Sequence, residues 1–135
     1  MNIKVKERGW AGHFCCAHRC KYRRNTLVSD GTRHIIVSSV GNMTINTDIN
    51  EIGHRKYYET MVFRGIKEGP YIEAGVSLEL TVSDDLKMGI YSDSYDDLPA
   101  DVDNIMDDQH DAIVEWVKNN FDKCYKEHKN GTLYS

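Results

Sequence analysis

The sequence predicts an α+β fold, with an N-terminal antiparallel β-sheet followed by a long amphipathic C-terminal helix. β-Branched and aromatic residues form several short runs before residue 83, and apolar residues recur every three or four positions after residue 101. With 135 residues, of which 40% are hydrophobic, the chain has the size and composition of a single domain with one core. We therefore expect one domain over 1–135, mainly β over 1–83, with an acidic linker over 84–100 and a helical part over 101–130.

The first predicted strands lie in the basic N-terminal part of the chain. Residues 2–6 alternate polar and apolar side chains, a pattern that favours a strand, and Gly9 and Gly12 end it. Further along, Asp30-Gly31 separates two β-prone runs, NTLVS and TRHIIVSSV. Because Asp-Gly favours a tight turn, these runs predict a β-hairpin.

The next strands follow a polar stretch, residues 41–53, which predicts an irregular connection. Residues 57–66 and 71–82 are rich in aromatic and β-branched side chains, and the turn sequence Glu68-Gly69-Pro70 separates them. The short links favour antiparallel pairing, so we expect four to six antiparallel strands in all.

The C-terminal part has the pattern of a helix. Residues 84–100 are acidic and carry few apolar side chains, and Pro99 precedes Asp101, which is expected, itself or through a neighbour, to cap the helix. Acidic residues come first and lysines last, as the helix dipole favours, and Gly131 ends the pattern. The apolar positions that fall on one helical face are Val102, Ile105, Met106, Ile113, Trp116, Val117, Phe121, Cys124 and Tyr125.

The formal net charge of -4 is divided unevenly along the chain. Residues 1–34 contain eight lysines and arginines against two acids, whereas residues 68–115 contain fourteen acids against one lysine. A basic stretch of this kind is able to hold a phosphate-bearing ligand, although the two halves could equally neutralise each other within a fold or an oligomer. No apolar run follows the N-terminus, so we expect neither a secretory signal nor a membrane span, and a cytosolic location.

Possible metal ligands cluster near the N-terminus. His13, Cys15, Cys16, His18 and Cys20 fall within eight residues, and the pair Cys124 and His128 would lie one helical turn apart. The cluster lacks the CxxC spacing of structural zinc sites, and Cys124 lies on the apolar stripe, which favours packing over metal binding. Metal binding by these cysteines is left as an open alternative, whereas a disulfide is disfavoured in a reducing compartment. No cofactor is expected.

The sequence carries no catalytic motif that fixes a mechanism. It lacks a nucleophile elbow, an HExxH motif, a GxxxxGK loop and a dinucleotide fingerprint, and the repeated Asp-Asp pairs are typical of a solvated acidic face. Basic neighbours could activate Cys15, Cys16 or Cys20, but their spacing identifies no partner base. We therefore interpret the chain as a binding protein rather than an enzyme.

The segment RCKYRRNT, residues 19–26, has the composition of a nucleotide site. Arginine grips phosphate through two hydrogen bonds, tyrosine stacks on bases, and an asparagine amide reads a base edge or a ribose hydroxyl. The alternative, of comparable weight, is a strand with a basic outer face. The overall acidity favours a small anionic ligand over duplex nucleic acid.

The stretches RGWAGHFCCAHRCKYRRNTLV, HIIVSSVGNM and RKYYETMVF, within residues 7–64, resemble small bacteriophage proteins. In size, and in having strands before helices, the chain also resembles the first-described family of phage Thoeris anti-defence proteins. That resemblance implies a protein that acts as a sponge in the cytoplasm of the infected bacterial host. It would bind, without cleaving them, the cyclic ADP-ribose isomers made by TIR-domain sensors. Members of the family form dimers that assemble further, and some hold cyclic oligonucleotides at a separate site. The residues that suit the family's ligand contacts in kind are Phe14, Arg19, Arg23, Arg24, Asn25, Tyr58 and Arg64.

Two other functions stay open. The acids between 84 and 111 could imitate a nucleic-acid backbone, which predicts an inhibitor that binds a host defence protein such as a CRISPR nuclease. A histidine-dependent enzyme that degrades a signalling nucleotide is the third possibility.

Overall fold

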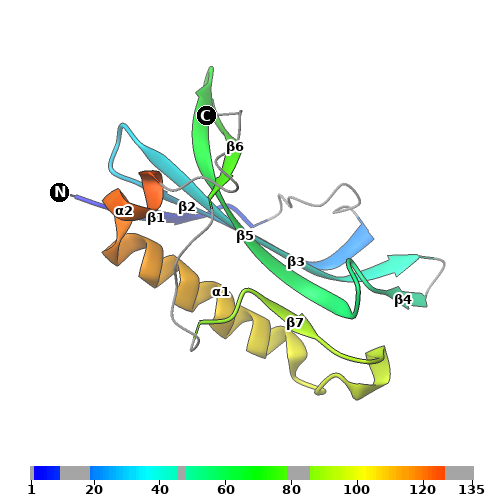
Figure 1. Cartoon of the computed structure of the whole chain (residues 1–135). Helices are drawn as coiled ribbons and strands as arrows, with labels where there is room; N and C mark the ends of the chain where they lie inside the picture. The colour runs from blue at the N-terminus through cyan, green and yellow to red at the C-terminus, as the bar shows by residue number, and fades with distance from the viewer. Residues whose placement is uncertain (1, 10–18, 46–47, 79–85, 127–135) are drawn as a thin grey trace.

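The computed structural model describes residues 2–9, 19–45, 48–78 and 86–126, and these form an antiparallel sheet with helices on one face (Figure 1). The main strands follow the order β1-β2-β3-β5-β6, while β4 pairs with the end of β3 and β7 with the start of β5. The architecture is thus α+β. The elements are β1 (Lys4–Glu7), β2 (Cys20–Ser29), β3 (His34–Ile45), β4 (Asp48–Asn50), β5 (Lys56–Glu68), β6 (Tyr71–Leu78), β7 (Gly89–Tyr91), the 3-10 helix η2 (Tyr95–Asp97), α1 (Val102–Asn119) and α2 (Phe121–Lys126).

Two tight turns set the register of the sheet. Between β2 and β3, Asp30 Oδ1 accepts hydrogen bonds from the backbone N–H groups of Thr32 and Arg33 at 2.9 and 2.7 Å, and Gly31 adopts a φ of 98°. The antiparallel pairing of Ser29 with His34 confirms the hairpin predicted from Asp30-Gly31. Glycine suits the turn because it adopts a positive φ without strain. Between β5 and β6, Gly69 has a φ of 58° and Glu68 pairs with Tyr71, as the turn sequence predicted.

Two segments differ from the sequence-based expectation. The predicted irregular connection over 41–53 is wrong in part, because β3 continues to Ile45 and folds back onto β4, so that Thr44 pairs with Ile49. The predicted linker over 84–100 contains β7 and η2. In both segments β-branched or aromatic residues stand among polar ones, and pairing with a distant strand supplies the stability that the local sequence lacks.

The helical part is divided into two helices. Asp101 occupies the N-cap position of α1 without a side-chain capping bond, and the 18 residues of α1 end at Asn119. The backbone N–H of Asn120 then donates to the carbonyl groups of Trp116 and Val117 before α2 begins. Residues 127–130 of the predicted helical part lie outside the described residues. Neither α1 nor α2 is long and apolar enough to cross a bilayer.

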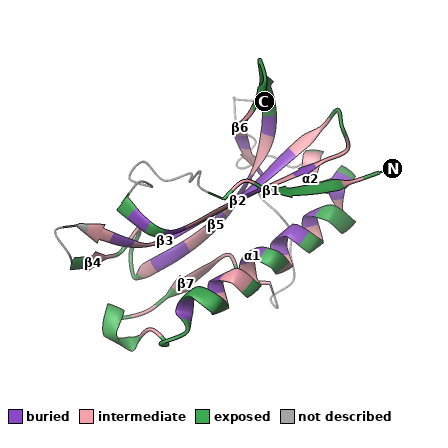
Figure 2. Ribbon diagram, turned by 180° about the vertical axis from the view of Figure 1, so that it is seen from behind, coloured by how far each residue is buried: buried purple, intermediate pink, exposed green. Residues whose placement is uncertain are grey.

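The main core lies between the sheet and the helices, and buried positions follow the strands and the facing side of α1 (Figure 2). One cluster joins strand residues such as Ile35, Val37 and Val62 to Ile113 and Val117 of α1. A second cluster packs the rings of Tyr22, Tyr57 and Tyr58 against Val102 and Met106 at the start of α1. The close packing explains Gly41 of β3, since a Cβ atom there would lie 2.2 Å from the ring of Tyr58.

Candidate functional site

The basic stretch of β2 divides between the two faces of the sheet. The hydroxyl of Tyr22 donates to Asp107 of α1 at 2.5 Å, and Arg24 also reaches Asp107, so both side chains face the helix. Because successive side chains of a strand alternate, Arg23 and Asn25 belong to the opposite face. Asn25 is buried there, and its Oδ1 accepts a hydrogen bond from Arg8 Nε at 2.8 Å.

Arg24 is occupied by three carboxylates. Its Nη2 lies 2.5 Å from Glu7 and 2.9 Å from Asp111, and its Nη1 lies 3.4 Å from Asp107. Burial alone would lower the pKa of Arg24, but the hydrogen bonds and charges of Glu7 and Asp111 outweigh it and raise the pKa. The same ion pair lowers the pKa of Glu7 despite its partial burial. Arg24 therefore attaches α1 to the sheet rather than projecting toward a ligand.

The other candidates from the sequence are also dispersed. Tyr58 is fully buried and its hydroxyl donates to Asp103 of α1 at 2.5 Å. Arg64 lies over the ring of Tyr125, 4.6 Å from its centroid, and donates to the Tyr125 carbonyl. Arg19 is exposed just before β2, and Phe14 lies outside the described residues. The described members of the set thus do not converge on one concave site.

A buried hydrogen-bonded chain links the sheet to α1 through His110. Its Nδ1 lies 2.6 Å from Ser39 Oγ and its Nε2 lies 2.8 Å from Thr26 Oγ1, while Ser39 also contacts Thr60 at 2.6 Å. Thr26 donates onward to Glu7 at 3.2 Å. A neutral imidazole with its proton on Nε2 satisfies every member, since Nε2 then donates to Thr26 and Nδ1 accepts from Ser39.

The hydrogen-bonded residues around His110 include a hydroxyl group next to an imidazole, as in a catalytic nucleophile and base, but they are buried. His110 and Ser39 are both 0% exposed, so that no substrate reaches the Ser39 hydroxyl. Burial lowers the pKa of His110 to about 4, and the positive charge of Arg24 acts in the same direction. The group is therefore a neutral structural link at physiological pH.

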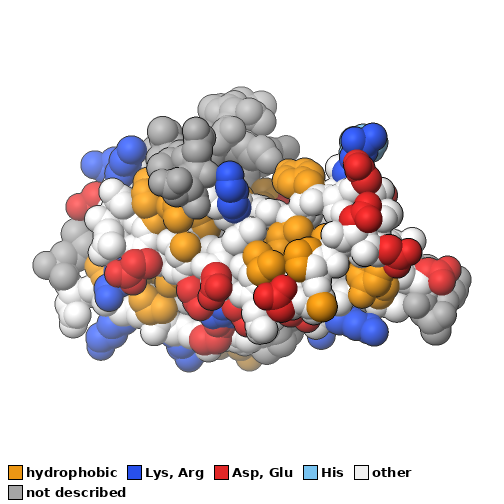
Figure 3. All heavy atoms as spheres, turned by 90° about the horizontal axis from the view of Figure 1, so that it is seen from below, with side chains coloured by type: hydrophobic (Ala, Val, Ile, Leu, Met, Phe, Trp, Pro, Cys, Tyr) orange, Lys and Arg blue, Asp and Glu red, His pale blue; other side chains and the backbone are white. Residues whose placement is uncertain are grey.

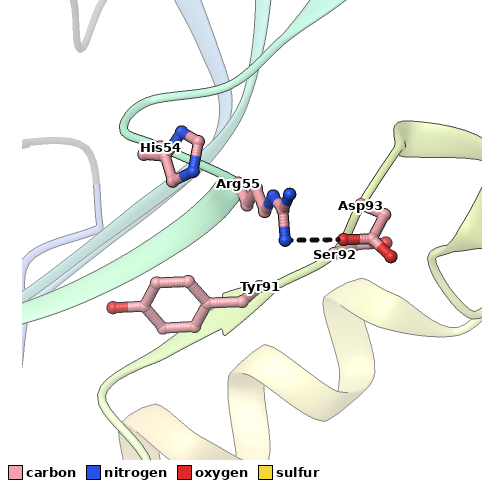
Figure 4. A pocket seen from close by; sticks show the side chains of 5 residues that line it. All are labelled: His54, Arg55, Tyr91, Ser92 and Asp93. Carbon is pink, nitrogen blue, oxygen red and sulfur yellow. Dashed lines mark ion pairs between the residues drawn. The ribbon is translucent and has the colours of Figure 1, made fainter.

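The side chains best placed for a ligand lie at the N-terminal end of β5. A pocket of about 530 Å³ is lined by the turn before β5 and by the end of β7 (Figure 4). It is open to solvent, and its lining residues are His54, Arg55, Tyr91, Ser92 and Asp93. Ligand pockets commonly measure ~300–1,000 Å³, so its volume suits a small molecule.

The backbone holds the two walls of the pocket together. The Ser92 N–H donates to the Arg55 carbonyl at 2.8 Å, and the Arg55 N–H donates to the Glu51 carboxylate at 2.5 Å. Arg55 adopts a φ of 57°, a left-handed conformation that is uncommon for a residue other than glycine. Such conformations persist where the surrounding contacts enforce them, and they are frequent at binding sites.

The pocket combines a cation with an aromatic ring. Tyr91 is 63% exposed, and the side chain of Arg55 is 61% exposed and directed toward Asp93, whose carboxylate lies 3.2 Å from Nη1 (Figure 4). Lys56 Nζ lies 5.5 Å from the centroid of the Tyr91 ring and is itself paired with the Glu59 carboxylate at 2.8 Å. Guanidinium and ammonium groups attract phosphate, and an exposed ring offers a stacking surface.

The same pocket is less suited to nucleophilic catalysis than to ligand binding. Ser92 Oγ donates to the carbonyl of Ser94 at 2.8 Å, so its hydroxyl proton is directed at the main chain rather than at His54. A serine nucleophile requires a hydrogen bond to its base. The geometry therefore favours binding over acyl-transfer chemistry.

No group of three or more potential metal ligands comes together among the described residues. Cys20 packs with Val40 and Met43, and Cys124 belongs to the main core with Phe121. Both cysteines are buried, which agrees with a packing role. Cys15 and Cys16 lie outside the described residues.

Sequence reasoning missed the pocket because its halves come from segments interpreted as irregular. His54 and Arg55 follow the predicted connection, and Tyr91 and Asp93 fall in the predicted linker. The one local signal was the aromatic and β-branched Ile90-Tyr91 pair within an acidic stretch, which indicates a short strand.

Comparisons with protein-family models, with curated proteins and with solved structures gave no significant match. The choice of a function therefore depends on the chemistry of the described residues.

Proposed function

We propose that the protein is a non-catalytic binder that sequesters a small phosphorylated molecule in the pocket formed by His54, Arg55, Tyr91, Ser92 and Asp93. The observation that supports this function best is the exposure of the Arg55 guanidinium and the Tyr91 ring around one cavity. Arg55 would grip a phosphoryl group, and Tyr91 would stack on an adjoining ring system. Stacking of this type contributes roughly 1–3 kcal/mol per base, and the charged hydrogen bonds contribute comparable amounts.

The sequence resemblance directs the choice of first ligand. Proteins of the Thoeris anti-defence type sequester cyclic ADP-ribose isomers, which combine a pyrophosphate with adenine, and both groups match the chemistry of the pocket. In this proposal the protein acts in the cytoplasm of an infected bacterium. A second copy of the chain would cover more of the ligand than one open pocket does, which favours a homo-oligomer.

Sequestration is tested by incubating the purified protein with the product of a TIR enzyme, removing unbound ligand and then heating the complex. We expect chromatography with mass spectrometry to recover the ligand intact at a fixed ratio to protein. A chemically altered product would instead identify the protein as an enzyme.

The position of the site is tested with matched arginine variants. Arg55→Gln is expected to weaken binding by about 10- to 100-fold, the range for loss of a charged hydrogen bond to phosphate. Arg19→Gln removes an arginine that is also exposed but lies outside the pocket, and it is expected to preserve binding. If Arg19→Gln abolished binding and Arg55→Gln did not, the ligand would lie at the basic end of β2 instead.

A second candidate function rests on the acidic surface of η2 and α1. Acidic side chains are spread over the face of the molecule that carries α1 (Figure 3), and those that are exposed include Asp96, Asp97, Asp101, Asp108 and Asp111. A surface of this kind could occupy the basic channel of a nucleic-acid-binding host protein.

The two functions respond oppositely to charge changes. Reversal of Asp96, Asp97 and Asp108 to lysine would abolish protection of the phage if the acidic surface were the active part, while Arg55→Gln would be harmless. Asp107 is left unchanged, because it holds Tyr22 and Arg24 and its loss would disturb the fold. If the pocket is the active part, the reverse pattern is expected.

A further inference from the structure

Asp93 occupies the guanidinium that the proposed function assigns to a ligand. Its Oδ1 lies 3.2 Å from Arg55 Nη1, and the side chains are 79% and 61% exposed respectively. Both residues line the same pocket, and the bond from Ser92 N–H to the Arg55 carbonyl fixes the backbone beside them. The carboxylate therefore stands where an anionic group of a ligand would meet Arg55.

An exposed ion pair of this type is easily exchanged. Such pairs contribute little net stability, because water screens them and two side chains must be ordered. A carboxylate and a phosphate use the same guanidinium donors, but a phosphate carries more charge and more acceptor oxygens. A phosphate can therefore displace Asp93, whereas a ligand with carboxylates alone has little advantage over it.

We infer that Asp93 is a built-in competitor that lowers the affinity of the pocket for anionic ligands, because a ligand must break its contact with Arg55 in order to bind. This inference rests on the proposed function, since it concerns the same pocket. In the free protein, the ion pair with Asp93 holds the Arg55 side chain across the pocket. When a ligand binds, its phosphoryl group replaces Asp93 as the partner of Arg55. Removal of the Asp93 carboxylate is therefore expected to strengthen anion binding.

The test uses Asp93→Asn with inorganic pyrophosphate and succinate as probes, and binding is followed by NMR titration of the backbone amide signals of the residues that line the pocket. We expect pyrophosphate to bind the variant about two- to five-fold more tightly, the range of one exposed ion pair. Succinate must displace the same carboxylate, so it is expected to gain by a similar factor while remaining the weaker ligand.

The matched control is Asp96→Asn, which removes a carboxylate from η2. Among the described contacts, Arg55 pairs with Asp93 and not with Asp96. If Asp93→Asn weakened pyrophosphate binding, or changed it no more than Asp96→Asn, Asp93 would not be a competitor. Should pyrophosphate bind the wild type and be lost in Arg55→Gln while Asp93→Asn had no effect, the inference alone would fail. If pyrophosphate bound neither the wild type nor Asp93→Asn, the inference and the proposed anion site would fail together.

Discussion

At the scale of single residues, the fold depends on a histidine in an apolar stripe. His110 follows Met106 by four residues and precedes Ile113 by three, so that it enters the core with them. Burying an imidazole costs free energy unless both nitrogens have partners, and Ser39 and Thr26 provide them. The result is a polar contact that specifies how α1 sits on the sheet.

This arrangement predicts a loss of stability in mild acid. The pKa of His110 is about 4 in the folded protein and about 6.5 when unfolded, so the unfolded state binds the proton more readily. The contribution of neutral His110 is fully present above pH 6.5 and is lost as pH falls toward 4, by an amount on the order of 3 kcal/mol. Urea unfolding measured at intervals from pH 7 to pH 4 should show this decline.

Two variants isolate the His110 effect. His110→Gln should be less stable at pH 7 and should show a flatter dependence on pH, because the titrating group is absent. His54→Gln makes the same change at an exposed position and should keep the wild-type stability at pH 7. An unchanged slope in His110→Gln would contradict the assignment.

The sequence indicated the chemistry of individual residues better than their partners. The RRN sequence of residues 23–25 suggested phosphate contacts, but strand alternation separates Arg23 from Arg24, and Arg24 meets acids that lie 17 to 87 positions away. Periodicity identifies which side chains share a face. It does not identify which distant carboxylate neutralises an arginine.

At the scale of elements, tyrosine hydroxyls fasten α1 to the sheet. Tyr22 on β2 and Tyr58 on β5 meet edge to face, 5.6 Å apart, and donate to Asp107 and Asp103, one helical turn apart on α1. Burial and these hydrogen bonds to carboxylates raise the pKa of both tyrosines. Both phenols therefore remain protonated donors at neutral pH.

A double-mutant cycle measures this attachment. Tyr58→Phe is expected to lower the free energy of unfolding by about 1–3 kcal/mol, because a hydrogen bond to a charged acceptor is lost. Asp103→Asn should have less effect in the Tyr58→Phe background than in the wild type. Tyr71→Phe, on an exposed ring of β6, is the control and should be neutral. Strictly additive effects of Tyr58→Phe and Asp103→Asn would show that the two side chains do not interact.

Elements with a strong local signal were predicted well, and those stabilised by distant pairing were not. The hairpin at Asp30-Gly31 follows from turn chemistry within a few residues. In contrast, the three-residue strands β4 and β7 exist through pairing with β3 and β5. Short strands of this kind carry too few residues to show a period.

At the scale of the whole molecule, stability is expected to fall from the centre of the sheet to its edges. β3 lies between β2 and β5, and its residues Ile35, Ile36, Val37 and Val40 are at most 1% exposed. β1 is an edge strand whose four residues are all exposed. Backbone amides in the centre should open only with global unfolding.

Native-state hydrogen exchange checks this order. We expect the slowest exchange in β3 and the paired part of β5, and fast exchange in β1. The rates for α1 should follow those of β3, because His110 and Ile113 join the helix to the central strands. Slow exchange in β1 of the isolated protein would contradict this order and would indicate that another surface covers the edge.

The location of the pocket also has a consequence for the molecule as a whole. Tyr91 lies in β7 and Asp93 follows it, so the pairing of β7 with β5 holds both residues at the pocket. This pairing involves three residue positions. Detaching this short segment costs less than melting the core between the sheet and α1. The protein would then release its ligand by local opening of β7, before the core unfolds. A bound molecule that contacts both Arg55 and Tyr91 would in turn stabilise the pairing of β7 with β5.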